Sequence, residues 1–262
     1  MDSTKTGIET KKAWSDNWKD HSVERVLEIF SYPRVTRLLD TFRSALPHDG
    51  KVLEGGCGLG PWVIKLRSLG YDVTGVDYDE VSIRKIREYD KNIPLYMSDV
   101  EKMPFGDGSF DAYMSLGVLE HFYEGPEKAI REARRVLKPG GVFMITLPYL
   151  NALLRMKLPL LALKRNKLMR KLFGRGKKDF YYEKYFKVRE IKKLLEEGGF
   201  TVKKAVPVDH IFAFVSFSGI FRDKSTYDGE NRLAVKFADF FGKIFPWQTA
   251  GSSLIVAVKK GE

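Results

Sequence analysis

The sequence contains a single cysteine, Cys57, so an intrachain disulfide and a metal cluster built on cysteines are both excluded. It also lacks any stretch of the ~20 uninterrupted apolar residues that a membrane-spanning helix needs. The first residues, MDSTKTGIETKK, do not contain the apolar run of a signal peptide. We therefore predict a cytoplasmic protein without a membrane span, and we predict no metal site.

Acidic residues are absent from residues 151–178, although they are frequent elsewhere in the chain. The formal net charge of the whole chain is +11, and this one segment contains ten basic residues. The excess positive charge is therefore a local patch and not a general property of the surface. The ten residues are Arg155, Lys157, Lys164, Arg165, Lys167, Arg170, Lys171, Arg175, Lys177 and Lys178.

Short apolar segments alternate with segments of helical periodicity through most of the 262 residues. Such alternation predicts an α/β fold, here a Rossmann-like, seven-stranded, mostly parallel sheet with helices on both faces. The predicted strands are residues 51–54, 72–76, 94–98, 110–115, 142–147, 201–206 and 253–258. The predicted helices between them are residues 62–68, 80–89, 125–137 and 190–200.

The chain shows no internal repeat and no interdomain linker, so we predict one domain, residues 1–262, with additions to the sheet. A helical leader precedes the sheet, and two insertions follow the fifth and sixth strands. The predicted parts are a disordered tail (1–12), a cap of two helices (13–46), a core (50–148), a basic helical insertion (149–185) and the rest of the sheet (186–262), which includes an irregular, aromatic-rich insertion (207–250).

The stretch with the most specific pattern is residues 52–66, VLEGGCGLGPWVIKL. It predicts a strand, a tight turn and a helix, with Gly56, Gly58 and Gly60 at alternate positions of the turn. Glycine is needed where the backbone takes a positive φ or approaches a ligand closely, and the following helix offers free N–H groups. A nucleotide-like cofactor fits such a turn. The spacing differs from the dinucleotide fingerprint G-x-G-x-x-G, because the third glycine comes one residue early.

The run EGGCGLG resembles motif I, D/E-x-G-x-G-x-G, of the class I S-adenosylmethionine-dependent methyltransferases. Three further segments in the same order resemble that family: VTGVD, SDVEKMPF and RRVLKPGGVFMITLP. Together they extend over residues 50–148. The resemblance implies S-adenosylmethionine as the cofactor, with an acid for the ribose at Asp77 and an acid for the adenine at Asp99. The implied cofactor-binding residues are Glu54, Gly56, Gly58, Gly60, Asp77, Tyr78, Asp99, Val100 and Leu116.

We expect methyl transfer to an oxygen or nitrogen atom, with a carbon atom as the alternative. An oxygen or nitrogen acceptor of high pKa needs a general base. His121, in GVLEHF, follows the predicted fourth strand, whose end lies beside the methyl group in the family that this chain resembles. We take His121 as the candidate base because imidazole titrates near neutral pH. The alternatives are that His121 only packs at a helix start or only shapes the pocket. His210, in the aromatic insertion, is a second candidate.

The acceptor is less well defined by the sequence. In the family that this chain resembles, an N/D-P-P-Y motif after the fourth strand is associated with methylation of amino groups in nucleic acid or protein. This chain has SLGVLEHF there, so the resemblance favours a small, hydrophobic or lipid-linked acceptor. Leucines alternate with the basic residues between 150 and 178, a composition typical of a helix on an anionic membrane surface. A solvated lid over the pocket is the alternative role for this segment. An RNA methyltransferase and a non-catalytic cofactor-binding protein are the alternative functions, and the sequence does not predict an oligomeric state.

Overall fold

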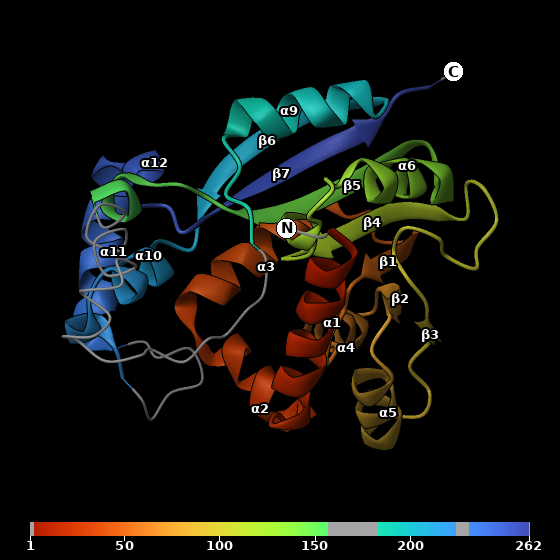
Figure 1. Ribbon diagram of the computed structural model, residues 1–262, viewed down its shortest axis with the longest axis horizontal. Helices are drawn as coiled ribbons and strands as arrows, with labels where there is room; N and C mark the ends of the chain where they lie inside the picture. Colours follow the sequence, from red (N-terminus) through yellow and green to blue (C-terminus); the bar gives the residue numbers. More distant parts are fainter. Residues whose placement is uncertain (1–2, 157–182, 224–230, 262) are drawn as a thin grey trace.

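The computed structural model describes residues 3–156, 183–223 and 231–261 of the chain, and within them a single sheet has the strand order β3-β2-β1-β4-β5-β7-β6 (Figure 1). Strands β1 to β5 pair in parallel, whereas β7 runs antiparallel to both β5 and β6. The predicted seven-stranded, mostly parallel sheet is confirmed. Its strands are β1 (Lys51–Gly55), β2 (Asp72–Asp77), β3 (Leu95–Met97), β4 (Phe110–Leu116), β5 (Leu137–Pro148), β6 (Phe200–Val208) and β7 (Ser252–Lys259).

Helices cover both faces of the sheet because neighbouring strand residues point to opposite sides. Val52 belongs to one buried cluster and Leu53 to the other. The Val52 side packs against α3, α4 and α5, and the Leu53 side packs against α6 and α9 (Figure 1). These helices are α3 (Pro33–Ala45), α4 (Pro61–Ser68), α5 (Glu80–Tyr89), α6 (Glu127–Val136) and α9 (Val188–Glu197).

Strand β1 lies between β2 and β4, so the strand order reverses beside it. Open α/β sheets bind ligands outside the carboxyl ends of the strands at such a reversal. The residues that follow β1, β2 and β4 are therefore brought to one edge of the sheet, although they are far apart in sequence. The sequence prediction set β5 five residues too late: β5 begins at Leu137, where LKPGG pairs with β4 through Phe110 and Leu137.

The N-terminal helices differ from prediction at their start. Residues 1–12 were predicted to be a disordered tail, but α1 begins at Ser3, so the described part of that tail is helical. Contacts with the rest of the fold explain the difference, because Thr10 is buried and Lys11 forms an ion pair with Asp99. The helices before α3 are α1 (Ser3–Lys19), α2 (Val23–Leu27) and the 3₁₀ helix η1 (Glu28–Ser31).

The aromatic insertion is largely helical where the structure describes it, which corrects the prediction of an irregular stretch. Its aromatic side chains form a small core of their own, centred on Phe214 and Phe221. The elements are α10 (His210–Phe217), η3 (Gly219–Phe221), α11 (Arg232–Ile244) and α12 (Pro246–Thr249). Most of the basic insertion, residues 157–182, lies outside the described residues. No helix within the described ranges is long and apolar enough to cross a membrane.

Candidate cofactor and acceptor site

A cavity of about 850 Å³ opens at the carboxyl ends of β1, β2 and β4. It is lined by nearly all of the residues that the sequence singled out, because the parallel strands end at the same edge of the sheet. The predicted residues in its lining are Glu54, Gly56, Gly58, Asp77, Tyr78, Asp99, Val100, Leu116 and His121. Among the predicted cofactor residues, Gly60 does not line the cavity.

The glycine turn has the backbone geometry that its sequence predicts. Gly56, Gly58 and Gly60 have φ angles of 73°, 54° and 69°, in the left-handed region that favours glycine. A side chain at Gly58 would collide with Trp18 of α1, and one at Gly56 would collide with Val118. Gly60 instead forms the N-cap of α4 and faces Ile86 of α5, so it shapes the turn without contacting the cavity.

Asp77 connects the end of β2 to the glycine turn. Its Oδ2 accepts a hydrogen bond of 2.7 Å from the Gly58 N–H, and its Oδ1 accepts one of 2.9 Å from the Asp79 N–H. Burial raises the pKa of Asp77 to about 6 despite these hydrogen bonds. Each carboxylate oxygen keeps a further lone pair, so the cavity side of Asp77 can accept hydrogen bonds from the hydroxyls of a ribose.

Glu54, at the end of β1, has a buried oxygen that needs a partner. Its Oε2 has no hydrogen-bond partner in the described part of the chain, and the side chain is only 3% exposed. Burial raises the pKa of Glu54 to about 8. An unpartnered buried carboxyl group is costly unless a donor reaches it. The ammonium group on the methionine part of S-adenosylmethionine supplies such a donor, so Glu54 and Asp77 both fit this cofactor.

Asp99 lies at the third strand end, where α1 meets the loop after β3. Its Oδ2 accepts a hydrogen bond of 2.7 Å from Lys11 Nζ, and its Oδ1 accepts one of 3.0 Å from the Glu101 N–H. Burial opposes ionisation of Asp99, but these two donors outweigh it and hold its pKa below the ordinary value. Tyr78 donates a hydrogen bond of 3.2 Å to the Lys11 carbonyl. The side of the cavity at Asp99, where the resemblance places the adenine, is thus closed partly by α1.

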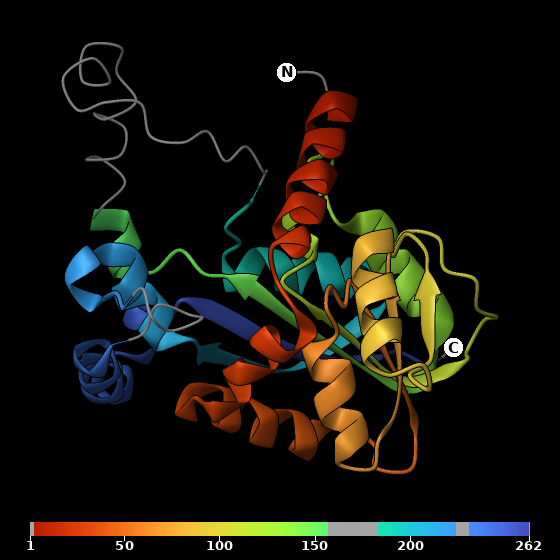
Figure 2. The same cartoon turned by 90° about the horizontal axis from the view of Figure 1, so that it is seen from below.

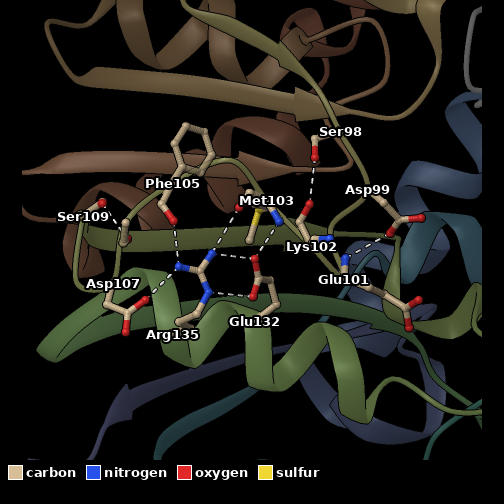
Figure 3. Close-up of polar contacts among 11 residues, drawn as sticks. Ser98, Asp99, Glu101, Lys102, Met103, Phe105, Asp107, Ser109, Glu132 and Arg135 are labelled. Carbon is tan, nitrogen blue, oxygen red and sulfur yellow. Dashed lines mark hydrogen bonds and ion pairs between the residues drawn. The ribbon is translucent and has the colours of Figure 1, made fainter.

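The loop that carries Asp99 and Val100 is held against α6 by Arg135, as Figure 3 shows. The guanidinium of Arg135 forms five hydrogen bonds: two to the Glu132 carboxylate, one to Asp107 and two to the carbonyls of Met103 and Phe105. Its planar fork of donors matches this arrangement in a way that lysine could not. Sequence analysis did not identify this contribution, because Arg135 and Met103 are brought together only by the packing of α6.

Helix α1 forms the opposite side of the cavity, with Thr10, Lys11, Trp14 and Trp18 in its lining. The N-terminal part of α1 extends away from the body of the protein (Figure 2). Its C-terminal end is bound by α5, because Lys85 Nζ donates hydrogen bonds to the carbonyls of Trp18, Lys19 and His21 at 2.8, 2.8 and 2.6 Å. These carbonyls belong to the helix end, where intrahelical partners run out.

His121 lies in the 3₁₀ helix η2 (Leu119–His121), directly after β4, and lines the cavity. Its ring makes an edge contact with Trp14, with the centroids 5.2 Å apart. The candidate base is therefore placed between the strand ends and α1. His210 does not line the cavity: its Nδ1 lies 3.1 Å from Thr249 Oγ1, and burial lowers its pKa. The structure gives His210 a packing role between α10 and α12.

Two further buried side chains, Cys57 and Glu120, are held in their protonated forms by burial. Cys57 lines the cavity, but burial raises the pKa of its thiol well above the ordinary value, so it is a poor source of thiolate. Glu120, next to His121, is buried outside the lining, and burial raises its pKa to about 8. Glu120 was not identified from the sequence, because an acid beside a histidine gives no sign of its burial. The described residues contain no group of side chains suited to a metal ion.

Comparisons with known proteins agree with this geometry. Residues 53–145 match a family described as a methyltransferase domain. A probable S-adenosylmethionine-dependent methyltransferase of Mycolicibacterium smegmatis is 32% identical over 97 residues, which are 37% of this chain and 37% of that protein. The chain thus matches little more than a third of the length of that relative. A demethylmenaquinone methyltransferase of Staphylococcus aureus is 29% identical over 167 residues, 57% of this chain and 67% of that protein.

Among solved structures, the 1,6-didemethyltoxoflavin-N1-methyltransferase of Burkholderia thailandensis has the same fold. The two chains superpose with a TM-score of 0.53 at 15% sequence identity, over 94% of this chain and 82% of that one. That structure contains 1,6-didemethyltoxoflavin and S-adenosylhomocysteine.

The sheet order, the glycine turn and the acids at successive strand ends define an α/β domain that binds a nucleoside-containing cofactor. With the family match over residues 53–145, the chain is shown to carry a class I S-adenosylmethionine-dependent methyltransferase domain. S-adenosylmethionine is the cofactor of this class, and Glu54, Asp77 and Asp99 are the residues that would hold its ammonium group, ribose and adenine.

Proposed function

We propose that this protein transfers a methyl group from S-adenosylmethionine to an oxygen or nitrogen atom of a small, hydrophobic acceptor. The observation that carries the proposal is that one cavity, of about 850 Å³, has both the cofactor acids and several aromatic side chains in its lining. Its volume is in the upper part of the range for small-molecule sites, which gives room for an acceptor beside the cofactor. The aromatic lining includes Trp14, Trp62, Phe122 and Tyr123.

Methyl transfer requires little from the protein beyond positioning the acceptor next to the cofactor. When bound, the cofactor supplies a methyl group on a sulfonium, which is an activated leaving group. Trp14 and Trp18 of α1 exclude water from the cavity, and Leu116, at the end of β4, and Val118, which follows it, line the cavity as well. His121 would take the proton from the acceptor hydroxyl or amine that receives the methyl group.

Two relatives support a small acceptor with ring character. The staphylococcal relative is named for demethylmenaquinone, and the Burkholderia structure contains 1,6-didemethyltoxoflavin. An apolar lining favours such a molecule over a charged polymer. We keep an RNA acceptor as the second candidate only because of the basic insertion, most of which lies outside the described residues. Membrane contact through residues 150–178 remains a prediction for the same reason.

The proposal is tested by incubating the protein with methyl-labelled S-adenosylmethionine and, separately, with lipid extract, small polar metabolites and total RNA. Label in the lipid extract or in an apolar small molecule is the expected result. Label in RNA alone would replace the proposed acceptor. Cofactor binding without label in any fraction would favour a non-catalytic cofactor-binding protein.

Substitution of His121 then tests the base. In His121→Asn we expect kcat to fall by roughly 10² to 10⁴, the usual contribution of general-base catalysis, while the Kd for the cofactor changes little. If kcat is kept and only the Kd changes, His121 is a wall of the pocket and not a base. Leu119→Ala, in the same short helix but buried away from the cavity lining, is the control for local unfolding.

A further inference from the structure

Helix α11 has an unusual outer surface for a helix of a globular protein. Leu233, Phe237, Phe240 and Ile244 are 37%, 38%, 58% and 52% exposed. At about 100° per residue, these four positions fall within an arc of about 60°, so they form one continuous stripe. We call these four residues the α11 stripe. Single exposed apolar residues are common, but a continuous exposed stripe with two phenylalanines indicates a binding surface.

Basic side chains border one edge of the α11 stripe. Arg232, Lys236 and Lys243 are exposed and fall next to it on the helical wheel. The one acid of α11, Asp239, lies beyond these bases and accepts a hydrogen bond of 3.0 Å from Arg37 of α3. The surface that α11 presents is therefore apolar with a positive border, and its acid is engaged by a cation of the protein itself.

The opposite side of α11 is fixed to the protein. Ala234 and Ala238 are buried, and Phe241 lies against Phe214 of α10. The helix lies at the end of the molecule opposite α5 and β3 in both views (Figures 1 and 2). A flat or extended surface could therefore meet α11 without blocking the strand-end cavity.

We propose that α11 is a docking surface for an anionic lipid surface. Phenylalanine, leucine and isoleucine on one face with lysine and arginine beside them is the composition of a helix that lies in the membrane interface. The bases complement the negative charge of the lipid headgroups, and their long stems let the charge stay at headgroup level. A protein partner would need a shape complementary to the stripe, whereas acyl chains adapt to any apolar side chain. This surface is distinct from the basic insertion and does not depend on the identity of the acceptor.

Co-sedimentation of the full chain with vesicles tests the proposal. The two vesicle types are phosphatidylcholine alone and an equal mixture of phosphatidylcholine and phosphatidylglycerol. We expect binding to the anionic vesicles and much weaker binding to the neutral ones. In Phe240→Gln/Ile244→Gln and in Lys236→Glu/Lys243→Glu, we expect the partition coefficient for anionic vesicles to fall about tenfold or more. Phe237 is not substituted, because it also packs against Phe221.

Matched controls distinguish binding through the α11 stripe from the effects of any exposed apolar side chain or of net charge alone. Met97→Gln removes an apolar side chain that is 60% exposed on β3, and Lys192→Glu/Lys203→Glu makes the same change in net charge on α9 and β6. Both should bind as the unmodified protein does. Equal binding of the α11 variants and the unmodified protein would overturn the proposal. So would a dimer in lipid-free solution that the α11 variants dissociate, because the stripe would then be covered by a second copy.

Discussion

The two sides of the cavity are built in different ways. The strand-end side consists of Glu54, Asp77 and the loop at Asp99, each placed by a strand of the sheet. Buried or part-buried hydrogen bonds hold Asp77 and Asp99. The α1 side consists of one helix, attached by the Lys11–Asp99 ion pair at the surface and by Lys85 at its C-terminal end.

Because the two sides are held by different kinds of interaction, we expect one side to recognise the cofactor and the other to close the cavity. Buried charged hydrogen bonds contribute more to binding than exposed ion pairs, which are screened by water and salt. We therefore expect the strand-end side to determine which cofactor binds, and the α1 side to determine how tightly the cavity closes around it. Substitutions on the strand-end side should therefore change the affinity for the cofactor most, whereas substitutions on the α1 side should have smaller effects, mainly on its dissociation rate.

The largest effect is expected at Asp77. In Asp77→Ala the ribose loses its acceptors and the Gly58 N–H loses its partner, so we expect the Kd for S-adenosylmethionine to rise about 100-fold, from the loss of charge-assisted hydrogen bonds. Isothermal titration calorimetry measures it. Asp72→Ala, at the exposed start of the same strand, is the control and should bind normally. A Kd within threefold of the unmodified value in Asp77→Ala would remove Asp77 from the site.

Glu54 should make the affinity for S-adenosylmethionine depend on pH. Its pKa is about 8 without the cofactor, so the carboxyl group is mostly neutral at pH 6 and gains its charge as pH rises. An ionised Glu54 attracts the cofactor ammonium, and we expect the affinity to rise roughly tenfold between about pH 6 and pH 8. In Glu54→Gln this rise should be lost. A rise that persists in Glu54→Gln would assign it to another group.

Glu120→Gln is the matched control, because Glu120 is equally buried but does not line the cavity. The folded protein keeps the Glu120 proton up to about pH 8, whereas the unfolded chain loses it near pH 4.5. Hence the free energy of unfolding falls as pH rises through this window. In Glu120→Gln that fall should be smaller, by up to about 5 kcal/mol in urea titrations, while the pH dependence of cofactor binding is kept.

Substitution of Arg135 tests how the loop that carries Asp99 is held. In Arg135→Met the Glu132 carboxylate and the carbonyls of the loop lose their donor, so we expect the free energy of unfolding to fall by about 2 to 4 kcal/mol. The Kd for the cofactor should rise about fivefold, because the loop that carries Asp99 is less ordered. Arg43→Met, at an exposed position of α3 outside the cavity lining, is the control. An unchanged stability would mean that the loop is held by its own turn.

The smallest effect is expected on the α1 side. In Lys85→Met the carbonyls at the end of α1 lose their donor, and we expect the cofactor dissociation rate to rise about threefold, the effect of one lost helix-end interaction. Stopped-flow quenching of Trp14 and Trp18 fluorescence measures this rate. Arg84→Met on the exposed face of α5 is the control. A loss of binding as large as that in Asp77→Ala would contradict the division between the two sides.

Much of the strand-end side was predictable because its signals are local. A positive φ at Gly56, Gly58 and Gly60 follows from residue type and spacing, and Asp77 and Asp99 end predicted strands. Tertiary contacts added what the local patterns did not show. Gly60 faces Ile86 and is not in the cavity lining, and the His210 ring lies against Thr249, also outside that lining.

The sequence by itself determined the order of strands and helices and the glycine turn, because each depends on residues close together in the chain. The class of cofactor came from the resemblance of several short segments, in order, between residues 50 and 148. Only the tertiary structure decided that α1 closes the cavity, that Arg135 holds the loop that carries Asp99, and that the α11 stripe faces outward. These features depend on contacts between residues such as Lys11 and Asp99, which are 88 positions apart. Periodicity shows that a helix has an apolar face, but only packing decides whether that face is buried or exposed.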